Sequence, residues 1–187
     1  MAELKLSGTS IISDASGTPT LNAGVTLNST FPAGHIINVV NASTNTPVTN
    51  GSGTNTIPVW VTVISATITP QTGNKVFVMA NWPVGSNVHY TFTRMLRGGT
   101  VLNTGTQTGT QHLGVYVNQP HAGDIVNAYA VAFIDSAHGG DGSTAITYTG
   151  QMSAQTGGNT TYAGRSHSTG NSAGSAGINI TLMEIKV

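Results

Sequence analysis

The residues of this chain that could do chemistry are few, and their spacing predicts no catalytic centre. Gly170-Asn171-Ser172-Ala173-Gly174 matches the Gly-x-Ser-x-Gly pattern, which places a nucleophilic serine on a tight strand-to-helix turn. Here the pentapeptide lies inside a tract rich in Gly, Ser and Asn, and no helix-forming sequence follows it. We interpret the match as a chance one, and we expect no catalytic residues and no enzyme activity.

Histidines are the next candidates. No two of them lie within four residues of each other, so the His-x-His and His-x-x-x-His spacings of metal ligands are absent. They are His35, His89, His112, His121, His138 and His167. A threefold axis could gather three copies of one histidine, but nothing in the sequence selects which one. We favour histidines that make local hydrogen bonds, and we predict no metal and no cofactor.

The densest polar loop is Asp135-Ser-Ala-His-Gly-Gly-Asp141-Gly. Carboxylates and backbone carbonyls of such a loop could hold calcium, but the spacing of Asp135 and Asp141 matches no EF-hand loop. An ordinary turn is the favoured interpretation, and a calcium site is the alternative. Arg94 and Arg97 are the only paired cations, and we expect them at a solvated hairpin end rather than at an anion site.

A group of three residues near the C-terminus could face a ligand. Tyr162, Arg165 and His167 lie within a Gly-rich segment, 157–177, which is predicted to be a long exposed loop. Loops of this length in compact domains are often functional. The other aromatic residues fall mostly in strand patterns, where packing in a core or an interface is the default expectation.

Charge is scarce and unevenly placed. The chain has 187 residues with six basic and six acidic side chains, and residues 15–74 carry no charge. An ordinary soluble domain is about 25% charged. Phosphate binding needs clustered Lys and Arg, so we expect no nucleic-acid partner and no membrane-surface binding. A surface that will be buried against neighbours avoids the desolvation cost of charge, so residues 15–74 are a proposed assembly surface.

Targeting and redox signals are equally sparse. There is no cysteine, and therefore no disulfide or thiolate site is possible. The first residues lack the apolar core of a signal peptide, and no apolar run approaches the ~18 residues of a transmembrane helix. We expect synthesis in a cytoplasm and no export by the general secretory route.

Strand signals dominate the sequence, and helix signals are nearly absent. The apolar runs, which are β-branched or alternating, are 35–41, 57–69, 75–82, 88–96, 113–117, 124–134, 145–148 and 178–187. Such spacing without helices predicts an all-β, antiparallel sandwich or jelly roll. In 124–134, Ala128, Ala130 and Ala132 share one face, which suits close approach by another sheet or subunit. A second Gly-rich segment, 98–111, is predicted to be an exposed loop.

The chain divides into an N-terminal arm, 1–30, and a β domain, 31–187. The arm has only short apolar pieces between turn residues, so we expect an extended segment that packs against other chains. Candidate assembly-interface residues, in the arm and in the 124–134 strand, are Ile11, Ile12, Leu21, Val25, Tyr129 and Phe133.

Three pieces of the sequence, in this order, resemble small structural proteins of tailed bacteriophages, notably those of marine and cyanobacterial hosts. They are Phe31-Pro-Ala-Gly-His35-Ile-Ile-Asn-Val-Val40, then Ala66-Thr-Ile-Thr-Pro70 with Lys75-Val-Phe-Val and Arg94-Met-Leu-Arg-Gly-Gly-Thr100, and finally Ile180-Thr-Leu-Met-Glu-Ile185. The resemblance covers about residues 31–187, and the last piece is the most specific. It implies a virion surface protein with a tumour-necrosis-factor-like jelly roll that forms a homotrimer.

Three functions follow as hypotheses. The first is a head decoration protein that contacts the major capsid protein through the arm. The second is a tail fibre or receptor-binding tip that contacts other tail proteins and recognises a host surface glycan. The third, an esterase or depolymerase, depends on Ser172 alone.

Overall fold

The computed structural model describes residues 2–6, 9–14, 20–21, 31–51, 59–86, 91–102, 116–118, 126–154, 160–168 and 174–187. For the segments before residue 31 and for 116–118, only the backbone is described. Every regular element in these residues is a β-strand, and every strand pair is antiparallel. This confirms the predicted all-β, antiparallel architecture.

The first large sheet is centred on the longest strand, β7 (Lys75–Ser86). One edge of β7 pairs with β11 (Asn127–Asp135), and the other edge pairs with β14 (Ile178–Ile185) and, beyond it, with β13 (Thr160–Ala163). Outermost lie β4 (Ile36–Thr44), paired with β14, and β5 (Val48–Gly51), paired with β13. The sheet is therefore four strands wide along most of its length.

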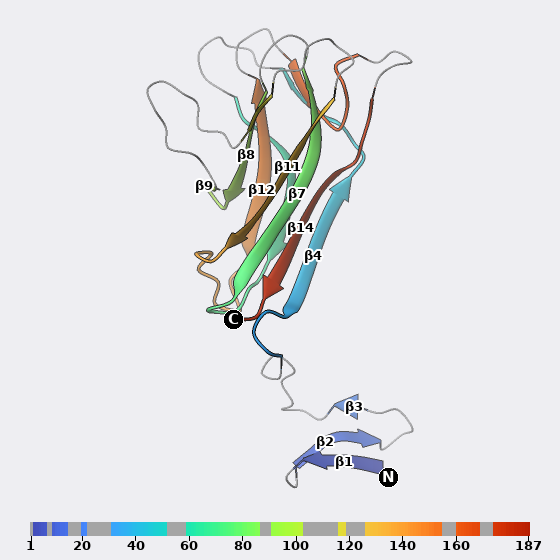
Figure 1. The fold of residues 1–187 in the computed structure, drawn as a ribbon, viewed down its shortest axis with the longest axis vertical. Helices are drawn as coiled ribbons and strands as arrows, with labels where there is room; N and C mark the ends of the chain where they lie inside the picture. Colours follow the sequence, from blue (N-terminus) through green and yellow to red (C-terminus); the bar gives the residue numbers. More distant parts are fainter. Residues whose placement is uncertain are drawn as a thin grey trace.

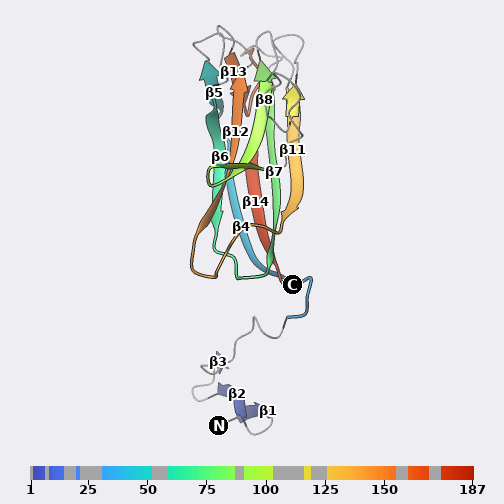
Figure 2. The same cartoon turned by 90° about the vertical axis from the view of Figure 1, so that its left-hand side faces the viewer.

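The second sheet faces the first, as Figure 2 shows. Its order is β10-β8-β12-β6, and β9 pairs with β8. These strands are β6 (Val61–Ile68), β8 (Thr91–Arg97), β9 (Thr100–Leu102), β10 (Tyr116–Asn118) and β12 (Ile146–Ala154). The two sheets form a β-sandwich (Figure 1).

The core lies between the sheets and follows from the two-residue period of the strands. In β7, Val76, Val78, Ala80 and Trp82 are buried, whereas Met79 between them is exposed. Trp82 packs against Tyr129 of β11, with ring centroids 4.3 Å apart. Alternate residues of a strand point to opposite sides, so the same alternation leaves an outer face on each sheet.

The N-terminal region differs from the extended arm that the sequence predicts. Its described backbone forms a small antiparallel sheet of β1 (Ala2–Leu6), β2 (Thr9–Asp14) and β3 (Thr20–Leu21). No strand pairing joins this sheet to the sandwich among the described residues. Figure 1 shows it beyond the end of the sandwich at which β4 begins.

The sandwich begins and ends at that same pole. The Gly34 amide donates a hydrogen bond to the Lys186 carbonyl at 2.7 Å, and the Lys186 amide donates to the His35 carbonyl at 2.8 Å. The last residues of the β domain are therefore fixed beside its first ones.

Two predicted loops contain strands. Residues 160–163 of the 157–177 segment form β13, in which Thr161 and Ala163 are fully buried, and 100–102 of the 98–111 segment form β9. These strands are three or four residues long and flanked by Gly or Asn, so their local sequence has little strand propensity. Pairing with neighbouring strands stabilises them instead. Among the described residues, no helix is long and apolar enough to cross a membrane.

Candidate functional site

The outer side of the first sheet carries a row of apolar side chains. Val39, Met183, Phe77 and Ile134 are successive partners across β4, β14, β7 and β11. Val39 is 56% exposed and Ile134 is 54% exposed. Met79, 40% exposed, extends the row along β7. We call these five residues and the neighbouring alanines of β11 the apolar face.

The alanines of β11 make a hollow in the apolar face. Ala128, Ala130 and Ala132 are exposed and line a depression of about 510 Å³, whose walls include Met79 and Asn81. The Asn81 side-chain oxygen is buried and has no hydrogen-bond partner among the described residues. A bulky side chain of another molecule could fill this space.

The apolar face is nearly free of charge. The four strands that carry it hold three charged residues, and two of them, Glu184 and Asp135, are buried on the core side. The third, Lys75, is the first residue of β7 and lies at the end of the sheet. Covering the apolar face would therefore remove apolar area from water without desolvating a central charge.

The predicted interface residues fall in different places. Tyr129 lies in the core and is 1% exposed, and Phe133 is partly buried against the same core. The exposed side of β11 is its alanine side. Ile11, Ile12 and Leu21 belong to β2 and β3, whose side chains are not described, and Val25 lies outside the described residues.

The structure brings together Tyr162, Arg165 and His167, which the sequence analysis proposed as a ligand-facing group. The Arg165 guanidinium carbon lies 4.0 Å from the Tyr162 ring centroid, and the His167 ring centroid lies 5.7 Å from that of Tyr162. Arg165 Nη1 also donates to the Ser166 and His167 carbonyls at 3.2 and 3.3 Å. The backbone passes close over Gly85 of β7, where a Cβ would come within 2.8 Å of the Arg165 carbonyl oxygen.

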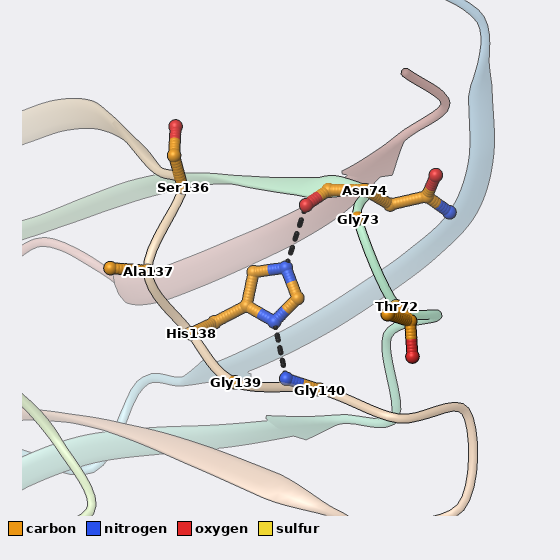
Figure 3. Close-up of a pocket in the computed structure, with 8 residues that line it drawn as sticks. All are labelled: Thr72, Gly73, Asn74, Ser136, Ala137, His138, Gly139 and Gly140. Carbon is orange, nitrogen blue, oxygen red and sulfur yellow. Dashed lines mark hydrogen bonds between the residues drawn. The ribbon is translucent and has the colours of Figure 1, made fainter.

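A second hollow, of about 470 Å³, lies at the pole where β7 begins and β11 ends (Figure 3). His138 crosses it and is 9% exposed. The Gly140 amide donates to His138 Nδ1 at 2.8 Å, so this nitrogen carries no proton, and Nε2 donates to the Asn74 carbonyl at 2.8 Å. Both ring nitrogens are thus engaged within the chain, which fits a structural role.

Asp135 and Asp141 do not converge on a common site. Asp135 accepts hydrogen bonds from Arg97 Nη1 at 2.7 Å and from the Tyr148 hydroxyl at 2.8 Å. Asp141 accepts from the amides of Ser143 and Thr144 within its own turn. Among the described residues, no group of three His, Asp or Glu could hold a metal ion. The expectation of a solvated Arg97 is wrong, because this side chain turns inward to a buried carboxylate.

The surroundings of Asp135 and Asp141 change the pKa values of several groups. Burial by itself raises the pKa of the Asp135 carboxyl, but hydrogen bonds from Tyr148, Arg97 and the Ala137 amide outweigh burial and lower it. Burial, together with the Asp135 carboxylate, raises the pKa of the Tyr148 hydroxyl. The hydrogen bonds of its turn lower the pKa of Asp141 well below its usual range.

Sequence reasoning missed a contact on the second sheet between Trp60, Arg94 and Gln151. These residues come from three separate parts of the chain, so no local spacing could have revealed them.

Ser172, the one nucleophile that the sequence offered, lies outside the described residues, as do His89, His112 and His121. No family model matches this sequence, and no curated protein is similar to it.

Proposed function

We propose that this chain is a non-enzymatic structural protein of a tailed-phage virion, and that it covers the head surface as a trimeric decoration protein. The observation that carries the proposal is the apolar face, which is uncharged at its centre and uncovered in the single chain. Exposed apolar patches of this kind mark association surfaces. The sequence resemblance to phage structural proteins supplies the setting.

The order of the strands supports a jelly roll of the tumour-necrosis-factor type. One sheet reads β4-β14-β7-β11 and the other reads β6-β12-β8, with β9 and β10 beside β8. Successive strands change sheet repeatedly: β6 to β7, β7 to β8, β11 to β12 and β12 to β13 all cross the sandwich. Such repeated crossing between two packed layers is what the wrapping of a jelly roll requires, and it supports the proposal.

A homotrimer would cover the apolar face. In a closed ring, the face of one chain packs against a different surface of the next, and the alanine hollow offers space for that neighbour. The chain has no net charge, so long-range repulsion between copies is weak. The N-terminal sheet, held apart from the sandwich, would be free to contact the major capsid protein.

Protein composition of the particle tests this function directly. Quantitative gel analysis and mass spectrometry of purified virions of the encoding phage should find the chain in hundreds of copies. A chain lacking residues 1–30 should remain a folded trimer but fail to coat particles. Absence of the chain from virions, or full coating by the truncated chain, would count against a head decoration protein.

The second candidate is a tail fibre or receptor-binding tip protein that recognises a host surface glycan. The observation that favours it is the convergence of Tyr162, Arg165 and His167, since an aromatic ring beside a cation is suited to a sugar ligand. This function predicts tens of copies per particle, and it predicts that purified protein binds host cells and blocks infection. Protein at micromolar concentration that neither binds cells nor blocks infection would contradict it.

A further inference from the structure

Arg94 lies over an aromatic ring on the outer face of the second sheet. In β8 its neighbours Thr93 and Met95 are fully buried, and Arg94 between them is partly exposed. Its guanidinium carbon lies 4.0 Å from the centroid of the Trp60 ring, and its Nε donates to the Gln151 side-chain oxygen at 2.8 Å. The ring and the amide together fix the orientation of the guanidinium group.

A buried amide beneath these residues holds their backbone in place. Asn50 is 3% exposed, and its side-chain nitrogen donates to the Val59 carbonyl at 2.6 Å and to the Met152 carbonyl at 3.3 Å. Val59 precedes Trp60, and Met152 follows Gln151. One hydrogen-bonding group thus positions the chain segments that carry two of the three residues, which is the support that a preorganised site requires.

The Arg94 charge has no acidic partner among the described residues. Asp135 pairs with Arg97, Glu184 is buried in the core of the other sheet, and Asp141 is engaged in its own turn. Burial lowers the pKa of Arg94, but a guanidinium group stays protonated in proteins. Nε is bonded to Gln151, and the two terminal nitrogens have no hydrogen-bond partner among the residues that the structure describes. They therefore form a fork that matches the two oxygens of a carboxylate.

We propose that Trp60, Arg94 and Gln151 form a binding site for a saccharide that bears a carboxylate. Arg94 binds the carboxylate, the Gln151 amide group donates to a sugar hydroxyl, and the indole edge contacts the apolar side of the sugar ring. Among the described residues the surrounding outer face carries no other charge and is rich in hydroxyl groups, with Thr62, Ser65 and Thr67 exposed on β6. Arg94 is therefore the electrostatic attractor on this side of the sandwich.

The site is independent of the proposed assembly function. It lies on the sheet opposite the apolar face and uses no residue of that face. It is also separate from the Tyr162 group, because Tyr162 belongs to β13 of the first sheet, and Arg165 and His167 follow that strand.

The chain contains its own reporter for this site. Of the two tryptophans, Trp82 is fully buried in the core, so a ligand-induced change of indole fluorescence arises from Trp60. We expect titration of the full chain with D-glucuronate to change the fluorescence with a millimolar dissociation constant. D-glucose lacks the carboxylate and therefore loses one charge-assisted pair. Its dissociation constant should be higher than that of glucuronate by about tenfold or more.

Variants separate the site from nonspecific binding. Arg94→Gln should raise the dissociation constant for glucuronate by about tenfold or more, and Arg94→Lys, which keeps the charge but loses the planar fork, should weaken binding too. Arg165→Gln, which removes the other aromatic-stacked arginine, is the matched control and should leave binding unchanged. Circular dichroism checks that each variant is folded.

Three results would overturn the proposal. They are equal binding of glucose and glucuronate, no change of fluorescence with glucuronate up to about 100 mM, and binding by a folded Arg94→Gln chain that equals the unaltered chain. Acetate that binds as tightly as glucuronate would overturn the saccharide class, because the anion alone would then account for the contact.

Discussion

The indole of Trp82 occupies the space where a side chain at Gly150 would lie. A Cβ built on Gly150 would come within 2.6 Å of the Trp82 ring carbon Cη2. Trp82 belongs to β7 of the first sheet and Gly150 to β12 of the second, so the two sheets are in close contact at this point. Real Cβ atoms essentially never approach another heavy atom so closely, and the fully buried ring cannot move aside.

Gly150→Ala should therefore destabilise the sandwich. We expect the free energy of unfolding to fall by about 1–3 kcal/mol, the usual cost of overpacking a core. Urea denaturation followed by fluorescence measures it. Gly51→Ala in β5 is the matched control, because a Cβ there meets no atom within 4 Å and its backbone conformation is ordinary. Equal stability of the two variants would show that the sheets can separate at no cost.

A charge in the alanine hollow should prevent self-association. Ala130→Arg places a cation in the middle of the apolar face, where burial against a neighbour would strand it without a partner. Native mass spectrometry should find three times the 19.1 kDa of one chain for the unaltered protein and a monomer for the variant. Ser65→Arg, on the exposed side of the opposite sheet, should remain trimeric. A trimeric Ala130→Arg chain would place the interface elsewhere.

The Asp135 pair should make stability depend on acid pH. The pKa of Asp135 in the folded chain lies below that in the unfolded chain, about 3.9 for a free Asp. The contribution of Asp135 to stability is complete at a pH above its pKa in the unfolded chain. It is lost as the pH falls through its pKa in the folded chain. Asp135→Asn should therefore cost clearly more stability at pH 7 than at pH 2. Tyr148→Phe, which removes one hydrogen bond to the carboxylate, should show a smaller difference of the same sign.

Denaturant unfolding of these variants at several pH values makes the comparison. A loss of stability that is the same at both pH values would mean that Asp135 acts by packing and not by its charge.

A buried hydroxyl without a partner offers a stabilising substitution. The Thr161 hydroxyl is buried between the sheets and has no hydrogen-bond partner among the described residues. Thr161→Val removes the desolvation cost of the hydroxyl and keeps the branched shape of the side chain. We therefore expect the free energy of unfolding to rise by about 1 kcal/mol. Thr67→Val is the comparison, because that hydroxyl pairs with the Thr147 hydroxyl at 2.8 Å. A loss of stability in Thr161→Val would reveal a polar partner for the hydroxyl.

Alternation of residues predicted the large strands because each has one side in the core. Val76, Val78 and Ala80 share a side in the sequence and are buried together in the structure. The same rule does not say which side of β11 faces inward, since Tyr129 and Val131 on one side and the alanines on the other are all apolar. The sandwich resolves the choice, because only the larger side chains fill the space against Trp82.

Contacts between distant segments could not be predicted from local patterns. Glu184, within the most specific piece of the resemblance, shares its side with Leu182 and Ile180, so alternation places it inward. What it binds depends on a turn more than 100 residues away: its carboxylate accepts from the Gln71 amide at 2.7 Å and from the Asn74 side chain at 2.6 Å. The meeting of Trp60 with Arg94 has the same nonlocal origin.

The hydrogen bonds between Gly34 and Lys186 and between His35 and Lys186 matter for protein engineering. A peptide fused after Val187 would emerge beside the segment that leads to the N-terminal sheet. Cargo added there would compete for space with whatever that sheet contacts on a particle.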